Sequence, residues 1–244
     1  MAQDLAGRRI LVTGASSGIG EGIARACAAA GASVAGLARR TDRLDALADE
    51  TGCIPVTVDL RDTAAAQTAV ATAADALGGI DAVVNNAGLW RGGPVMDTTV
   101  ESWRAMLEVN VLGLLAVTQA AVGHLRAAGG GDVVNVSSLS GRRVPNAAAG
   151  VYSGTKFAVH AISEGLRREL LADRIRVTVV SPGMVAIEAG GSDPESDLRD
   201  RLRDLGSDVS ITPEHVARTI VHILGQPPEI TLREIALAPT AQES

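Results

Sequence analysis

The chain has 244 residues, 46% of them hydrophobic, so it is long enough to bury a sizeable core. Its formal net charge of −6 argues against nucleic acid as a main partner, because phosphate binding needs a positive field. The two cysteines lack metal-ligand spacing, the first residues do not follow a signal-peptide pattern, and no uninterrupted apolar run approaches the roughly 18 to 20 residues of a membrane helix. We therefore expect a soluble cytoplasmic protein with reduced cysteines and no membrane partner.

Short β-branched runs alternate with longer segments rich in Ala and Leu along the whole chain. The runs predict strands at 9–14, 33–38, 54–58, 81–86, 132–138, 176–181 and 234–238. The longer segments predict helices near 18–30, 41–51, 62–78, 99–128, 151–172 and 212–225. Apolar strands separated by helices predict a Rossmann-type α/β fold, a doubly wound, mostly parallel seven-stranded sheet with helices on both faces. No linker or repeat divides the chain, so we expect a single domain over 1–244.

The first strand runs into a glycine-rich turn, "VTGASSGIGEGIA" at 12–24. Gly14, Gly18 and Gly20 allow a tight turn and a close approach of the backbone to a ligand. The following helix offers N–H groups and its positive dipole end to a pyrophosphate. The spacing G-x-x-x-G-x-G differs from the commonest dinucleotide fingerprint, and the glycines alone could be structural. Their position between a strand and a helix favours dinucleotide binding.

The end of the second strand reports which dinucleotide is bound. An NAD site usually carries an acid there, whereas this strand ends with Ala38, Arg39 and Arg40. A guanidinium suits the extra 2′-phosphate of NADP(H). The alternative is a solvated arginine pair beside the next helix. We predict NADP(H).

The helix around 103–125 is apolar on more than one face. Packing on a sheet buries one stripe only, so a second face needs a cover. A wider groove between flanking helices is the alternative to a partner subunit. We predict a homodimer or homotetramer.

Tyr152 is the only tyrosine of the chain, and Lys156 follows four positions later. In a helix the phenol and the ammonium are neighbours on one face. The polar segment 182–210 follows the sixth strand, at the edge of the sheet where ligands of open α/β folds bind. We expect a substrate lid there, around 183–210, with a solvated surface excursion as the alternative.

Four motifs in this order resemble the short-chain dehydrogenase/reductase family in its compact single-domain form: "TGASSGIG", "NNAG" (85–88), "YSGTK" (152–156) and "SPG" (181–183). The match covers nearly the whole chain. The resemblance implies a hydride transfer between a nicotinamide and a small-molecule carbonyl or alcohol.

The resemblance also implies a catalytic set of four residues. Tyr152 would be the general acid or base, with Lys156 favouring its phenolate and holding the nicotinamide ribose. Ser138 would hydrogen-bond the substrate oxygen, although Ser137 could be the inward hydroxyl, and fourteen positions separate Ser138 from Tyr152, about one more than in the family. Asn110 would support a water-linked proton path, or serve only packing or a bend.

For the cofactor, the resemblance implies contacts with residues from several turns. They are Gly14, Ser16, Ser17, Gly18, Ile19, Gly20, Arg39, Arg40, Asp59, Leu60, Asn86, Ala87, Gly88, Tyr152, Lys156, Pro182, Gly183 and Val185. Where the family often has a threonine that binds the nicotinamide carboxamide, this chain has Ile187, which cannot make that hydrogen bond. Backbone groups of Val185 and Ile187 could replace it, or the lid grips the cofactor more weakly.

Several weaker expectations concern the substrate pocket and the histidines. Trp90 and Arg91 are candidate pocket residues, and Arg142 or Arg143 could meet an anionic group. The four histidines show no ligand spacing, so we expect no metal. The rival function is a non-catalytic protein that senses NADP(H) on the same fold, but binding alone would not require the phenol. An epimerase or dehydratase would need an added substrate domain.

Overall fold

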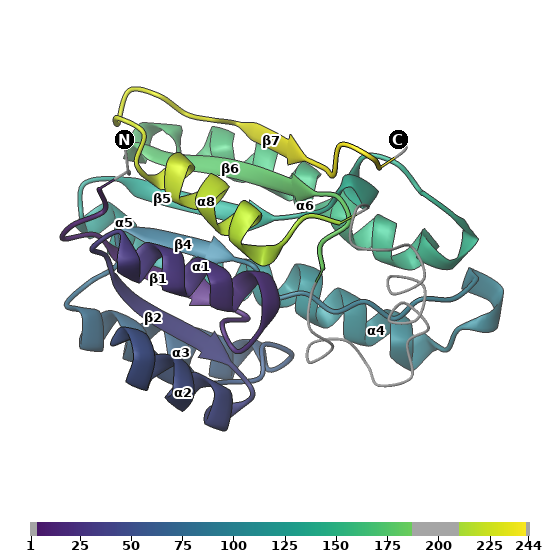
Figure 1. Cartoon of the computed structure of the whole chain (residues 1–244), viewed down its shortest axis with the longest axis horizontal. Coiled ribbons are helices and arrows are strands. Elements are labelled where there is room, and N and C mark those ends of the chain that lie inside the picture. Colours follow the sequence, from purple (N-terminus) through teal and green to yellow (C-terminus); the bar gives the residue numbers. More distant parts are fainter. Residues whose placement is uncertain (1–3, 187–209, 243–244) are drawn as a thin grey trace.

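The computed structural model describes residues 4–186 and 210–242. Seven strands form one sheet in the order β3-β2-β1-β4-β5-β6-β7 (Figure 1). Their bounds are Arg9–Thr13 (β1), Ser33–Ala38 (β2), Ile54–Thr57 (β3), Ala82–Asn85 (β4), Gly131–Val136 (β5), Ile175–Pro182 (β6) and Glu234–Leu237 (β7). All six neighbouring pairs are parallel, and the order reverses between β1 and β4, as in doubly wound folds. The predicted fold class is confirmed.

Helices cover both faces of the sheet. Their bounds are Gly18–Ala29 (α1), Thr41–Thr51 (α2), Thr63–Leu77 (α3), Val100–Leu107 (α4), Leu114–Ala127 (α5), Gly150–Glu169 (α6) and Pro213–Leu224 (α8). Buried residues of α1, α2 and α8 form one core with one face of the sheet, and those of α3 and α5 form a second core with the opposite face. The near-continuous apolar strands are therefore explained by burial from both sides.

The predicted long helix at 99–128 is in fact interrupted. A π-helical turn, Glu108–Gly113, joins α4 to α5. Single π turns insert one extra residue and often occur at functional sites. Asn110 lies in this turn and is buried.

The sequence shows no uninterrupted apolar run as long as a membrane helix, but the helical stretch Val100–Ala127 meets a broader criterion. By length and composition this continuous helical stretch of 28 residues could cross a membrane, which a count of uninterrupted apolar runs does not detect. Of its most apolar window, 56% is buried inside the protein, as in the core helix of a soluble protein.

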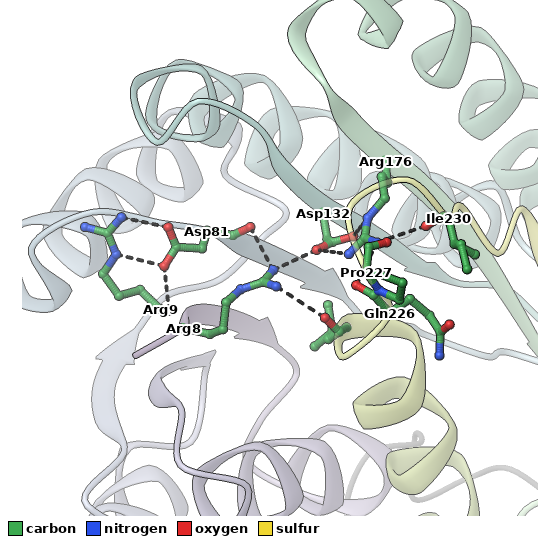
Figure 2. Close-up of polar contacts among 9 residues, drawn as sticks. Arg8, Arg9, Asp81, Asp132, Arg176, Gln226, Pro227 and Ile230 are labelled. Carbon is green, nitrogen blue, oxygen red and sulfur yellow. Dashed lines mark hydrogen bonds and ion pairs between the residues drawn. The ribbon is translucent and has the colours of Figure 1, made fainter. Parts of the chain in front are cut away.

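Charged side chains join the amino-terminal ends of the central strands, at the edge opposite the carboxyl ends. Asp132 accepts hydrogen bonds from Arg8 (2.7 Å) and from Arg176 (2.7 and 3.0 Å), and only 3% of its side chain is exposed. Arg176 also donates to the carbonyl oxygens of Gln226, Pro227 and Ile230 (Figure 2). This network ties β1, β5 and β6 to the segment between α8 and β7.

Both cysteines are buried and unpaired. Burial raises the pKa of the Cys27 thiol to about 12 and that of Cys53 to about 11. They are inert parts of the core.

Candidate active site

A cavity of about 1030 Å³ lies at the carboxyl ends of the strands. It extends from the arginines after β2, past the glycine-rich turn, to Tyr152 on α6. The predicted site residues that line it are Gly14, Ser16, Ser17, Gly18, Ile19, Arg39, Arg40, Asp59, Leu60, Asn86, Ala87, Gly88, Ser138, Tyr152, Lys156, Pro182, Gly183 and Val185. Gly20 and Asn110 lie behind its wall. The fold thus gathers residues that are up to 171 positions apart at one edge of the sheet.

The glycine-rich turn is shaped for a ligand that approaches the backbone. Gly14 and Gly18 have φ angles of 70° and 55°, which disfavour other residues. A Cβ on Gly20 would lie 2.2 Å from the carbonyl oxygen of Gly14, so the turn has no room for a side chain there. The Ser17 side chain does not cap the helix, which leaves the first N–H groups of α1 directed at the cavity. These features fit the diphosphate of a dinucleotide.

The two arginines after β2 have different surroundings. The Arg40 guanidinium donates to the Ser16 carbonyl oxygen (3.2 Å) and to the Ser16 hydroxyl (3.1 Å), and also bonds the Ser17 hydroxyl. It therefore holds the glycine-rich turn against β2. Arg39 is exposed at the cavity rim, and its charge adds to the lowering of the Asp59 pKa that Arg61 mainly causes.

Thr13, which precedes Gly14, joins the first and fourth strands at the cavity. Its hydroxyl accepts hydrogen bonds from the backbone N–H groups of Asn86 and Ala87, both 3.0 Å away. The Asn86 amide donates to the Thr13 carbonyl oxygen at 3.0 Å. Sequence reasoning assigned no role to Thr13, although its place at the strand end, next to the turn, was a usable signal.

Tyr152 and Lys156 lie one turn apart on α6, facing the end of β5. The Ser138 side chain lies beside the phenol of Tyr152 and acts to lower its pKa. Ser137 points elsewhere, because its hydroxyl donates to the Lys156 carbonyl oxygen at 3.2 Å. Of the two serines left open by the sequence, Ser138 is therefore the one beside the phenol.

Burial dominates the acid–base properties of this pair. It raises the pKa of Tyr152 to about 12, against a lowering by the Ser138 hydrogen bond, and it lowers the pKa of Lys156 to about 8. The sequence argument expected the lysine to favour the phenolate. Instead, the Lys156 ammonium lies 5.8 Å from the centre of the Tyr152 ring and donates to the Val136 carbonyl oxygen. The shift of the Tyr152 pKa is caused by burial and by Ser138, and not by this ammonium.

Asn110 joins the π-helical turn to the loop after β4 and to α6. Its Oδ1 accepts from the Leu89 N–H (2.7 Å), and its Nδ2 donates to the Leu89 carbonyl oxygen (2.9 Å) and the Thr155 hydroxyl (3.0 Å). Asn110 thus makes packing contacts within a bend close to the site, as one of the two sequence interpretations had it. Its role in a water-linked proton path stays a prediction. Thr155 is a partner that the sequence motif did not single out.

The turn after β6 is fixed by backbone and tail contacts. Gly183 N–H donates to the Leu237 carbonyl oxygen (2.7 Å), and Met184 N–H donates to Oε1 of Gln242 (2.8 Å). Val185 forms a bridge with Ile211. Gln242 lines the cavity and was missed, because nothing in the sequence pattern relates the end of the chain to this turn. Ile187 and residues 187–209 of the predicted lid lie outside the described residues.

Two loops close the end of the cavity near Tyr152. Trp90, Arg91 and Arg143 line it, as the sequence suggested for Trp90 and Arg91 and, as one of two alternatives, for Arg143. Arg142 does not, since its guanidinium binds Glu234 at 2.7 Å. The His160 ring lies 3.2 Å from the Ser181 hydroxyl. Among the described residues, no group of His, Cys, Asp and Glu side chains could hold a metal ion.

Comparisons with known proteins agree with this geometry. Residues 8–196 match the model of the short chain dehydrogenase family. Dehydrogenase/reductase SDR family member 11 of Gallus gallus is 34% identical, with 98% of each chain covered. The closed form of a serine dehydrogenase complexed with NADP⁺ superposes with a TM-score of 0.90 at 31% identity, over 97% of this chain and 96% of the other. A short chain dehydrogenase from Burkholderia cenocepacia in complex with NADP gives a TM-score of 0.85 at 32% identity, over 96% and 98%. The chain therefore belongs to the short-chain dehydrogenase/reductase family of oxidoreductases.

Proposed function

We propose that this protein is an NADP(H)-dependent carbonyl reductase or alcohol dehydrogenase, with Tyr152 as general acid or base. The observation that carries the proposal is one cavity with a phosphate-binding turn at one end and the Tyr152–Ser138 pair at the other. When bound, the cofactor supplies or accepts the hydride, and the protein supplies orientation and the proton.

The preference for NADP(H) rests on the strand end after β2. Arg39 and Arg40 line the cavity there, and Asp59, the one carboxylate among its described lining residues, binds Arg61 at 2.6 Å. A 2′-phosphate would meet guanidinium groups instead of an acid. The NADP complexes of two structural neighbours support the same preference.

Proton transfer is assigned to Tyr152. In the reduction its phenol donates a proton to the substrate oxygen, which the Ser138 hydroxyl also binds. Near neutral pH the phenol is protonated and can donate this proton, while burial, by raising its pKa to about 12, makes it a weaker acid than a free phenol. Lys156 binds the nicotinamide ribose. Asn110, through its hydrogen bonds to Leu89 and Thr155, positions the residues that border the proton path.

The quaternary structure is proposed to be a homodimer or homotetramer of single-domain subunits. Large apolar side chains of the α4–α5 stretch and of α6 are exposed: Leu107, Leu112, Leu115 and Phe157. The π-helical turn contacts α4, α5 and α6, so the elements that carry these side chains adjoin one another, and a second copy would bury them. The partners are then a small substrate and other copies of the chain, without nucleic acid or membrane, in the cytoplasm.

The test is a paired one. The purified protein is mixed with NADPH or NADH and a panel of ketones, aldehydes and secondary alcohols, while absorbance of the reduced nicotinamide is followed. Tyr152→Phe should lower kcat by about 100-fold or more while NADPH still binds. Full turnover by this variant would refute the mechanism. NADPH binding without turnover of any compound would favour the alternative, a non-catalytic NADP(H) sensor.

A further inference from the structure

The two loops beside Tyr152 form one wall of the cavity. The Gly93 N–H, in the loop after β4, donates to the Ala148 carbonyl oxygen, in the loop between β5 and α6, at 2.9 Å. This contact ties the two loops together, and each loop contributes one arginine, Arg91 or Arg143, to the cavity that Ser138 and Tyr152 also line. The two loops therefore bring positive charge to the cavity that would hold the substrate.

Arg143 differs from its neighbour Arg142. The Arg142 guanidinium is bound by Glu234 and does not line the cavity, whereas Arg143 is half-buried and lines it. Within residues 4–186 and 210–242, no hydrogen bond or ion pair engages Arg143. A half-buried guanidinium without a partner loses hydration that an anionic ligand can replace.

Among the residues that the structure describes, no acid in this part of the cavity offsets the charge. Among the described lining residues the single carboxylate is Asp59, which lies near the arginines after β2 and binds Arg61. A cleft lined by one sign of charge concentrates ligands of the opposite sign. The cofactor phosphates have their own site at the glycine-rich turn, so they do not account for Arg143.

We propose that the substrate carries an anionic group, a carboxylate or a phosphate, in addition to its carbonyl or alcohol, and that Arg143, supported by Arg91, binds this group. The inference rests on the proposed function and deepens it by naming the substrate class. The guanidinium binds the anion while Tyr152 and Ser138 bind the reacting oxygen, so two anchors fix which carbon faces the nicotinamide. Arg143 is thus a specificity-determining residue.

The experiment compares matched pairs of compounds. The anionic compounds are 2-, 3- and 4-oxo acids, each paired with its neutral methyl ester, and dihydroxyacetone phosphate, paired with neutral dihydroxyacetone. In the wild-type enzyme at least one anionic member should exceed its neutral partner by tenfold or more in kcat/KM. Arg143→Gln should lower that kcat/KM by about 10- to 100-fold and change the neutral partner by less than about threefold. Which pair responds decides between carboxylate and phosphate.

Arg142→Gln is the matched control, because it removes the same charge from the same loop without touching the cavity. It should leave the acid-to-ester ratio unchanged. Neutral esters that react as well as their acids would overturn the inference while leaving the proposed function intact. A loss of NADPH affinity in Arg143→Gln with an unchanged ratio would overturn it as well.

A binding measurement separates this inference from the proposed function. Trp90 lines the cavity, and the other of the two tryptophans, Trp103, is replaced by Phe so that emission reports on the cavity alone. Pyruvate, levulinate and dihydroxyacetone phosphate are titrated without cofactor, each beside its neutral partner. At least one anion should quench the fluorescence of Trp90 in the protein that retains Arg143, and the same anion should not quench it when Arg143→Gln is added. This result without any turnover would support the anion site and refute the proposed function, and no quenching by any of the anions would refute the anion site.

Discussion

The Lys156 ammonium donates a hydrogen bond to the carbonyl oxygen of Val136, 2.9 Å away at the end of β5. The contact places a buried cation under the cavity, next to Tyr152, and burial lowers its pKa from 10.5 to about 8. A pKa lowered by burial means that the charged form destabilises the folded state. A lysine at position 156 therefore lowers the stability of the folded protein, and we attribute its presence there to its role in the reaction.

We expect Lys156→Met to be inactive but more stable than the wild type. At pH 7 the burial penalty corresponds to about 3 kcal/mol, and the lost hydrogen bond to Val136 offsets about 1 kcal/mol of it, so the gain is about 2 kcal/mol. The folded pKa is below the unfolded one, so the penalty is complete below about pH 8 and disappears as the pH rises toward 10.5.

Urea unfolding of both proteins at several pH values measures this difference. The gap should narrow steadily between pH 8 and 10.5, with each variant compared to the wild type at the same pH. A methionine variant less stable than the wild type at pH 7 would contradict the prediction.

Arg39 and Arg40 should respond differently to substitution. Arg40 holds the Ser16 carbonyl and hydroxyl, so Arg40→Gln should weaken NADPH and NADH together by loosening the glycine-rich turn. Arg39 is exposed at the rim, so Arg39→Gln should raise the Kd for NADPH about tenfold and leave that for NADH unchanged. Fluorescence titration of the reduced nicotinamide gives both constants. Equal losses for the two cofactors in Arg39→Gln would assign the 2′-phosphate elsewhere.

The sequence predicted most of the fold because local patterns determine it. All seven strands and the helix starts at Gly18 and Thr41 agree within one or two residues, since apolar runs and glycine turns are local signals. The π-helical turn at Asn110 was missed, because the segment is apolar on more than one face, so the shift in phase that an inserted residue causes leaves no visible break in its pattern. The Met184–Gln242 contact was also missed, since it depends on tertiary folding. The charge state of Tyr152 depends on burial, which a motif does not report.

Gln242 should position the turn after β6. Its Oε1 accepts from the Met184 N–H at 2.8 Å, and both residues line the cavity. Gln242→Leu keeps the size of the side chain and leaves that N–H without its acceptor, so we expect KM for the cofactor to rise about three- to tenfold. Gln226→Leu is the control, since Gln226 lies near the opposite edge of the sheet, where its side chain bonds His222. An unchanged cofactor KM in Gln242→Leu would show that Met184 is held by other contacts.

The charged network at the amino-terminal ends of the strands should carry stability but not activity. Asp132 is buried between Arg8 and Arg176, so Asp132→Ala leaves two guanidinium groups without their carboxylate (Figure 2). Breaking such a buried pair costs about 3 to 5 kcal/mol. Arg126 and Asp173 form a more exposed ion pair, with 52% and 28% of the side chains exposed, and Asp173→Ala should cost less than about 1 kcal/mol.

Urea unfolding compares the two variants, and turnover at a temperature well below both melting points tests the second half of the prediction. Because the network lies at the edge of the sheet opposite the cavity, kcat of Asp132→Ala should stay within about twofold of the wild type, as expected for a substitution that leaves the site geometry intact. Equal losses of stability in the two variants would mean that burial adds nothing to the Asp132 network. A large fall in kcat would instead reveal that the amino-terminal ends of β5 and β6 control the geometry of Ser138 and of the turn after β6.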